Sequence, residues 1–228
     1  MKIGSTDSEL VHAIVPLKVL KESKTRLSPI LRPTERAELT IAMLADVLSA
    51  LKKSKKISSI TVVSADKTAL KTARLLGADP VWERKSCGLN RAICFAIRKR
   101  NLASSSVLAI HADLPLLTAH EVDRFLRGAR GYPIALAPSK DQSGTNALLL
   151  NPASLVRPAF GKGSFKRHLS IAKQRRLRCK VRRAKGLGFD LDEPKDLVEL
   201  MHNKSQSNAA RFLRTVTGRS LECHKATY

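Results

Sequence analysis

The sequence predicts an α/β protein with a mostly parallel, doubly wound sheet. Two patterns carry this prediction: short apolar runs typical of strands alternate with segments that repeat apolar residues at helical spacing, and the loops between them are short. Composition adds a third observation, because 228 residues with 43% hydrophobic and 4% aromatic content can bury one sizeable, largely aliphatic core. We therefore expect a single domain over residues 1–202 and a flexible tail over residues 203–228.

The first half of the chain shows the clearest alternation. Residues 11–15 are typical of a buried strand that stops at Pro16. Pro33 suits the first position of a helix, and the cations of residues 52–56 close that helix where its dipole is negative. The remaining expected elements are strand 57–64, helix 67–76, strand 80–83, helix 89–98, strand 106–112 and helix 121–127, which begins with a capping-box spacing at Thr118 and Glu121.

The second half is less regular and predicts antiparallel strands at one edge of the sheet. The expected elements are strands 134–137 and 146–150 around a polar loop, a helix from Ser164 to Lys173, extended segments 177–181 and 188–191, and helix 194–201. From Asn203 the periodicity is lost, so at most a marginal helix over residues 209–216 is expected in the tail.

Charge limits the classes of partner. The chain has 42 Lys and Arg against 19 Asp and Glu, a net charge of +23, which suits nucleic acid, an anionic surface or small anionic substrates. No basic block is interleaved with aromatic residues, as a single-strand binder would prefer. Nucleic acid is therefore the less favoured partner, although a basic nucleic-acid-binding protein stays an alternative.

Cysteine usage and hydropathy indicate a cytoplasmic protein without a membrane partner. Cys87, Cys94, Cys179 and Cys223 form no CxxC pair, so ordinary reduced thiols are expected rather than a zinc site. The first ten residues lack the apolar core of a signal peptide, and no apolar run approaches the roughly 18 residues of a membrane span.

The loop after the first strand carries a candidate polyphosphate site. It begins at Pro16 and Leu17 and then presents Lys18, Lys21, Lys24 and Arg26. Ligands of α/β proteins bind at the carboxyl ends of the strands, where Arg offers a planar fork of donors and Lys a mobile charge. The alternative is a solvated loop in a basic protein.

Three carboxylates form a candidate Mg²⁺ site. Asp113 follows the strand 106–112, and Asp190 and Asp192 are two residues apart, so that both face one side if this segment is extended. Mg²⁺ favours one or two carboxylates together with phosphate oxygens and waters. The alternatives are a turn before Pro115 for Asp113 and a helix cap before Pro194 for Asp192.

A second anion site is indicated by Gly161-Lys-Gly-Ser164 at the start of a helix. Glycines allow close approach of the backbone, and the amides at a helix N-terminus bind anions. Thr145 and Asn146 lie in another polar loop and could add donors. The histidines are scattered, and no Ser/His/Asp arrangement indicates nucleophilic catalysis.

In combination, these motifs resemble the 2-phospho-L-lactate guanylyltransferase family, CofC, and its bacterial relative FbiD, over about residues 11–201. The motifs that carry the resemblance are Ile14-Val-Pro-Leu-Lys18, Ser23-Lys-Thr-Arg-Leu27, Ala42-Met-Leu-Ala-Asp-Val-Leu48, Val62-Val-Ser64, Gly88-Leu-Asn90, Ala112-Asp-Leu-Pro-Leu-Leu117, Gly144-Thr-Asn-Ala-Leu-Leu149, Phe160-Gly-Lys-Gly-Ser-Phe165 and Gly188-Phe-Asp-Leu-Asp192.

The resemblance implies a nucleotidyltransferase fold of the nucleotide-diphospho-sugar transferase, glycosyltransferase-A-like type. It implies a guanylyltransferase of coenzyme F-420 biosynthesis that joins GTP to 2-phospho-L-lactate, phosphoenolpyruvate or a phosphoglycerate and releases pyrophosphate. It leaves a homodimer open. The implied residues are Lys18, Lys24 and Arg26 on the triphosphate and in catalysis, Pro16, Leu17, Ser64 and Asn90 with the nucleotide, Thr145, Gly161 and Ser164 with the acid, and Asp113, Asp190 and Asp192 on Mg²⁺.

One rival is a nucleotidyltransferase acting on a sugar phosphate or on a molybdenum cofactor. Those enzymes usually begin with a glycine-rich loop, where this chain has Pro16-Leu17-Lys18. The candidate acids differ only by small groups around one carboxylate, so the sequence leaves the choice among them open.

Overall fold

The computed structural model of the chain describes residues 10–225, with side chains through residue 216. One seven-stranded sheet forms the centre, in the order β3-β2-β1-β4-β6-β5-β7. The strands are β1 (Val11–Pro16), β2 (Ile57–Ser64), β3 (Asp79–Trp82), β4 (Val107–Ile110), β5 (Ile134–Pro138), β6 (Thr145–Leu150) and β7 (Cys179–Val181). β6 runs antiparallel to its neighbours β4 and β5, and every other pair is parallel.

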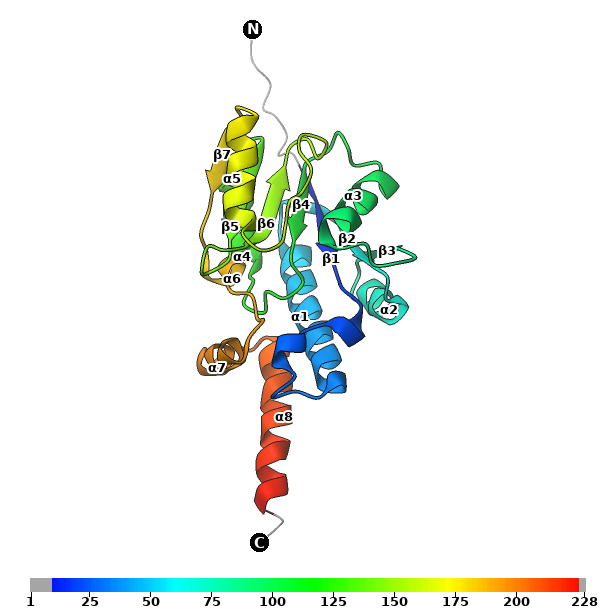
Figure 1. Ribbon diagram of the computed structural model, residues 1–228, viewed down its shortest axis with the longest axis vertical. Helices are drawn as coiled ribbons and strands as arrows, with labels where there is room; N and C mark the ends of the chain where they lie inside the picture. Colours follow the sequence, from blue (N-terminus) through cyan, green and yellow to red (C-terminus); the bar gives the residue numbers. More distant parts are fainter. Residues whose placement is uncertain (1–9, 226–228) are drawn as a thin grey trace.

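Helices cover both faces of the sheet (Figure 1). The apolar faces of α1 (Pro33–Lys53), α2 (Lys67–Leu75) and α4 (Ala119–Gly128) pack into the core on one face. Those of α3 (Leu89–Lys99) and α5 (Ser164–Gln174) pack into the core on the other face. The doubly wound, mostly parallel α/β sheet expected from the sequence is thus confirmed.

The two helix starts predicted from local sequence motifs are confirmed. Pro33 opens α1, and the Glu35 carboxylate accepts a hydrogen bond of 2.8 Å from the backbone N–H of Arg32. At α4, the Thr118 hydroxyl accepts from the N–H of Glu121 and the Glu121 carboxylate accepts from the N–H of Thr118, each at 3.2 Å. This reciprocal pair is the expected capping box.

The remaining helices gather at one end of the sheet. They are the 3₁₀ turns η1 (Leu20–Glu22) and η2 (Thr25–Leu27), and the helices α6 (Lys185–Gly188), α7 (Pro194–His202) and α8 (Asn208–Lys225). A third apolar cluster joins η2, α7 and α8 to the first half of α1. Its buried members are Leu27, Leu31, Leu39, Met43, Phe189, Leu191, Leu197, Leu200, Ala209, Ala210 and Leu213. This cluster holds the loop after β1 against the segment that carries Asp190 and Asp192.

The structure differs from the expected flexible tail. Helix α8 extends beyond the body of the fold (Figure 1), and its first turns pack on α1, with Ala209 and Ala210 fully buried. The buried carboxylate of Asp46, on α1, accepts hydrogen bonds from the N–H groups of Asn208 at 2.7 Å and Ala209 at 3.0 Å. This cap comes from a distant part of the chain, so local periodicity did not reveal the helix.

Two smaller expectations also differ. Gly188 ends the helical turn α6, so only the residues after it are extended. The antiparallel strand β6 lies inside the sheet, whereas the edge strand β7 is parallel to β5. Within residues 10–225, no helix is long and apolar enough to cross a membrane.

Candidate active site at the carboxyl ends of the strands

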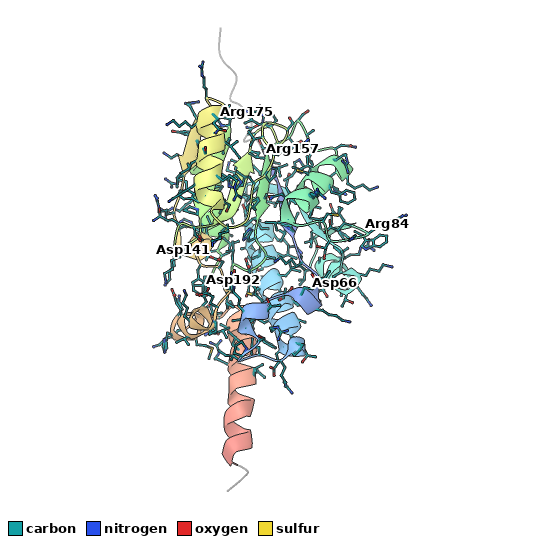
Figure 2. The ribbon with its side chains drawn as sticks, in the orientation of Figure 1. Asp66, Arg84, Asp141, Arg157, Arg175 and Asp192 are labelled. Atoms are coloured by element: carbon teal, nitrogen blue, oxygen red, sulfur yellow. The ribbon has the colours of Figure 1, made fainter. Side chains whose placement is uncertain are left out.

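The predicted site residues lie at one end of the sheet. The parallel strands β1, β2 and β4 all end there, and the antiparallel β6 begins there, because the N–H of His111 donates to the carbonyl of Asn146 at 2.9 Å. Figure 2 shows Asp66 and Asp192 at this end, with Arg175 at the opposite end of the molecule. Such an end is the usual ligand-binding edge of an open α/β sheet.

Lys24 joins two of the three predicted carboxylates. Its Nζ donates to Oδ2 of Asp113 and to Oδ1 of Asp192, each at 2.6 Å. Its side chain is 7% exposed, against 22% for Asp113 and 45% for Asp192. The backbone of Lys24 is left-handed, with φ of 52°, where it begins η2 and points inward. The family resemblance implied that Lys24 binds the triphosphate, and the structure adds that it bridges two carboxylates.

The protonation of this cluster follows from burial and charge. Burial by itself lowers the pKa of Lys24, but the charges of Asp113 and Asp192 outweigh it, so the pKa is raised. Burial raises the pKa of Asp113, but Lys24 and then His111 outweigh it, so this pKa is lowered. Both groups are therefore charged at neutral pH.

Asp190, the third predicted carboxylate, is held by Asn146 rather than by Lys24. Nδ2 of Asn146 donates to Oδ1 of Asp190 at 3.1 Å and to the carbonyl of Leu187 at 3.0 Å. The N–H of Leu191 donates to the carbonyl of Asp113 at 3.1 Å, which ties the two carboxylate segments together. Burial, followed by the charge of Asp113, raises the pKa of Asp190. The sequence singled out Asn146 only weakly, and its amide is the group that fixes this segment.

The carboxylates fit a magnesium ion that shares its coordination with phosphate. Oδ1 of Asp113 is buried and accepts no hydrogen bond from the described part of the chain, which leaves ligating capacity unused. Lys24 offsets only one of three clustered negative charges. Among residues 10–216, however, no three His, Cys, Asp or Glu side chains converge enough to hold a metal by themselves. Hard carboxylate oxygens supplemented by triphosphate oxygens suit Mg²⁺.

The loop after β1 presents its other cations to solvent. Lys18 is exposed, and Arg26 is 69% exposed with Nη1 3.5 Å from Oε1 of Glu193. Pro16 and Leu17 are buried at the end of β1. The loop is held by Asp66, whose Oδ2 accepts from the N–H of Leu20 at 3.0 Å.

The same Asp66 caps α2, since its Oδ1 accepts from Ala69 at 3.0 Å. Sequence reasoning missed Asp66, although an Asp just before a helix is a recognisable cap signal. Ser64 is fully buried, and its Oγ accepts from the N–H of Asp66 at 3.0 Å. In this arrangement the Ser64 hydroxyl stabilises the turn beside the site.

The second predicted anion site is built on the start of α5. Gly161 and Gly163 have φ of 119° and 72°, so each adopts a backbone conformation that favours glycine before Ser164 begins the helix. The side chain of Asn90 fixes this loop: its Oδ1 accepts from the N–H of Phe160 at 2.7 Å and its Nδ2 donates to the same residue's carbonyl at 3.1 Å. Asn90, expected near the nucleoside, thus also orders the loop of the expected acid site.

Thr145 is oriented by a histidine that sequence reasoning treated as scattered. The Nε2 of His168 accepts from the N–H of Ala159 at 3.0 Å, and its Nδ1 lies 3.0 Å from Oγ1 of Thr145. Burial, with the charge of Arg167, lowers the pKa of His168 to about 4. The neutral ring therefore carries its proton on Nδ1 and donates it to Thr145. The Thr145 hydroxyl then keeps its own proton for donation to an anion.

Comparison with known proteins agrees with this geometry. Residues 11–226 match the family described as "Guanylyl transferase CofC like". The phosphoenolpyruvate guanylyltransferase of Rubrobacter xylanophilus is 41% identical over 83% of this chain and 93% of that protein. The 2-phospho-L-lactate guanylyltransferase of Methanobrevibacter smithii is 28% identical over 90% of this chain and 89% of that protein.

A solved structure shows the same fold at low identity. It is the putative nucleotide-diphospho-sugar transferase from Desulfovibrio desulfuricans G20, with a TM-score of 0.72, 18% identity, and coverage of 92% of this chain and 96% of that one. This likeness confirms the nucleotide-diphospho-sugar transferase fold. The family match spans almost the whole described chain, and a relative above 40% identity covers more than four fifths of it. The chain is therefore a nucleotidyltransferase that belongs to the CofC-like guanylyl transferase family.

Proposed function

We propose that this protein joins GTP to a phosphorylated three-carbon acid, releases pyrophosphate, and serves coenzyme F-420 biosynthesis. One observation carries the proposal: the carboxylates bridged by Lys24 share one end of the sheet with the cationic loop after β1 and with Thr145, which contacts His168 of α5. In this proposal the cationic loop binds the triphosphate, and the start of α5 binds the acid. The carboxylates hold the Mg²⁺ that offsets the negative charge between the two substrates. The names of the relatives supply guanine as the base, and phosphoenolpyruvate or 2-phospho-L-lactate as the acid.

The reaction asks the protein for charge neutralisation rather than for a general base. The attacking phosphate oxygen of the acid is already an anion, and it displaces pyrophosphate from the α-phosphorus of GTP. Mg²⁺, bound by Asp113, Asp190 and Asp192 together with the triphosphate, would offset the negative charge there. Lys18 and Arg26 bind the triphosphate, and Thr145 with Ser164 and the amide of Gly161 orient the acid. Positioning and electrostatics thus provide the catalysis.

Lys24 has two candidate partners in this scheme. Without substrate its Nζ bridges Asp113 and Asp192 at 2.6 Å each. The triphosphate brings additional negative charge to the same place, so the ammonium can share its donors between carboxylate and phosphate. This keeps the two carboxylates aligned before the nucleotide arrives.

The decisive experiment combines the purified protein with Mg²⁺, each nucleoside triphosphate and each acid: phosphoenolpyruvate, 2-phospho-L-lactate, and the 2- and 3-phosphoglycerates. Mass spectrometry identifies the product, and pyrophosphate release gives the rate. We expect a guanylylated acid only with GTP and one of the acids. Asp113→Asn should lower turnover about a hundredfold or more, as expected for loss of a preorganised electrostatic group. The matched control is Asp79→Asn. Asp79 lies on β3 and forms an exposed ion pair with Arg100.

Formation of a nucleotidyl sugar or a molybdenum-cofactor product instead, or no nucleotidyl product with any pair, would overturn the proposal. A homodimer and a cytoplasmic location stay predictions. The prediction of a cytoplasmic location is supported by Cys87, Cys94 and Cys179, which are free thiols within the described residues.

A further inference from the structure

A strip of cations runs along one edge of the molecule, from the end opposite the candidate active site toward α6. Eight of the thirteen residues from 173 to 185 are Lys or Arg, and no Asp or Glu occurs between Asp141 and Asp190. The strip follows the end of α5, the edge strand β7 and the start of α6. Figure 2 shows Arg175, at one end of the strip, on the side of the molecule opposite Asp192. Its cations are Lys173, Arg175, Arg176, Arg178, Lys180, Arg182, Arg183 and Lys185.

The fold does not neutralise this strip. Among the ion pairs of the described residues, none involves any of the eight cations. The hydrogen bonds of their side chains go to neutral groups instead. Arg178 donates to the carbonyl of Gly131 at 2.7 Å, Arg183 to the side-chain oxygen of Gln142 at 2.9 Å, and Lys185 to that of Asn203 at 3.3 Å.

The strip stores electrostatic repulsion that a polyanion would relieve. Side chains two apart on a strand lie about 7 Å from each other on one side of the sheet. That spacing is within the screening length of about 8 Å at physiological salt. Neighbouring cations therefore repel one another in the free protein. A chain of phosphates can pair with several of them and release condensed counterions, which favours binding strongly at low salt.

An aromatic ring lies beside these cations. The ring centroid of Tyr132 is 5.3 Å from Cζ of Arg178 and 5.4 Å from Nζ of Lys180. Tyr132 precedes β5, so the ring and the cations come from segments more than forty residues apart. The sequence showed no aromatic residue within the basic run, and the tertiary structure supplies one. Cations that follow a strand beside a partly exposed ring are typical of single-stranded nucleic-acid binding.

A membrane surface fits the strip less well. The large exposed apolar side chains within residues 10–216 are Leu10, Ile30, Leu75, Trp82 and Val198. None of these belongs to the strip, so nothing there would insert among lipids. A duplex also fits less well, because the strip follows the edge strand β7 and includes only the ends of α5 and α6, so it presents no helix lengthwise to a groove.

We propose that the strip binds single-stranded nucleic acid without sequence preference, with the backbone along β7 and a base against Tyr132. This activity is separate from the nucleotidyl transfer. The test is fluorescence anisotropy of a labelled 20-nucleotide RNA and a DNA of the same sequence, measured from 50 to 300 mM KCl. Arg175→Gln/Arg178→Gln/Lys180→Gln should weaken binding about tenfold or more at 100 mM KCl. It should also lower the slope of log affinity against log salt by about 2, since each phosphate contact on a single strand contributes about 0.7.

The matched control removes the same number and kind of charges elsewhere. Lys53→Gln/Arg74→Gln/Arg124→Gln replaces exposed cations on α1, α2 and α4 and should leave most of the affinity intact. A second variant, Tyr132→Leu, should weaken single-strand binding about tenfold through lost stacking. The conservative Arg175→Lys/Arg178→Lys should retain binding, and far-UV circular dichroism checks that each variant is folded.

Several results would overturn the proposal. They are no binding of either oligonucleotide at 100 mM KCl, equal losses in the strip and control triples, unchanged affinity in Tyr132→Leu, and tighter binding to a 20-base-pair duplex or to phosphatidylserine vesicles. Pyrophosphate release should be the same in the wild type and in the strip triple. Failure of the proposed transferase function would thus be seen in that assay, and failure of this proposal in the binding assay.

Discussion

Replacing Lys24 with Met tests whether the cluster beneath the β1 loop is organised as described. The substitution keeps the apolar length of the side chain but removes its charge. The ammonium that it removes is 7% exposed at the side chain and donates to two carboxylates at 2.6 Å each. Asp113, which is 22% exposed, then keeps a largely buried carboxylate without its cation. Asp192, which is 45% exposed, turns its charge to water.

The expected cost follows from these exposures. Removing one partner of a buried pair costs about 3–5 kcal/mol, because the remaining charge is buried and uncompensated. The half-exposed Asp192 contributes only as a surface pair does, about 0–1 kcal/mol. We therefore expect the free energy of unfolding to fall by about 3 kcal/mol at pH 7. For a chain of this size, that lowers Tm by about 6–12 °C.

The pH dependence of this loss gives a second measurement. In the wild type the pKa of Asp113 is lowered, so its stabilising effect is present above the unfolded value of about 3.9 and is lost as pH falls through the folded value. In the variant, burial acts without Lys24 and raises this pKa, so lowering the pH from 7 stabilises the variant relative to its own value at pH 7. The difference in the free energy of unfolding between the wild type and Lys24→Met should therefore become smaller as the pH falls toward 5.

Urea unfolding at pH 7, 6 and 5 measures these differences. Lys21→Met is the control, because Lys21 is exposed on the same loop and forms no ion pair within the described residues. A loss below about 1 kcal/mol, a loss equal to that of Lys21→Met, or a difference that does not change between pH 7 and 5 would refute the reasoning. The pair would then be an ordinary surface contact.

Three further outcomes are expected. Asp46→Ala should lower the free energy of unfolding by about 1–2 kcal/mol and expose the chain to protease near the start of α8, because two backbone N–H groups lose their acceptor; unchanged proteolysis would contradict this. Arg26→Ala should raise KM for GTP and Ser164→Ala should raise KM for the acid, and equal effects of both on both substrates would show a single shared site. His168 should stay neutral above about pH 5 by NMR titration, because burial lowers its pKa to about 4; His168→Gln should then raise KM for the acid without a new inflection in the pH profile.

The sequence by itself determined the features that depend on local periodicity. Strands such as β4 and β5 appear as continuous apolar runs because they are buried on both faces. The start of α1 and the capping box of α4 involve residues three apart, so their signals are complete within one turn. The ordered motifs from residue 14 to 192 also carried the resemblance that the family match confirms.

The tertiary structure decided which distant groups meet. Lys24 was expected on the triphosphate, but the third apolar cluster brings its loop onto Asp113 and Asp192, 89 and 168 residues away. Asp46 caps α8 across 162 residues, which turned an expected tail into a packed helix. These contacts depend on the order of strands in the sheet and on burial. A local sequence pattern shows neither the strand order nor the burial. The free energy of a buried ion pair or helix cap depends on both partners, and here the partners are far apart in the sequence.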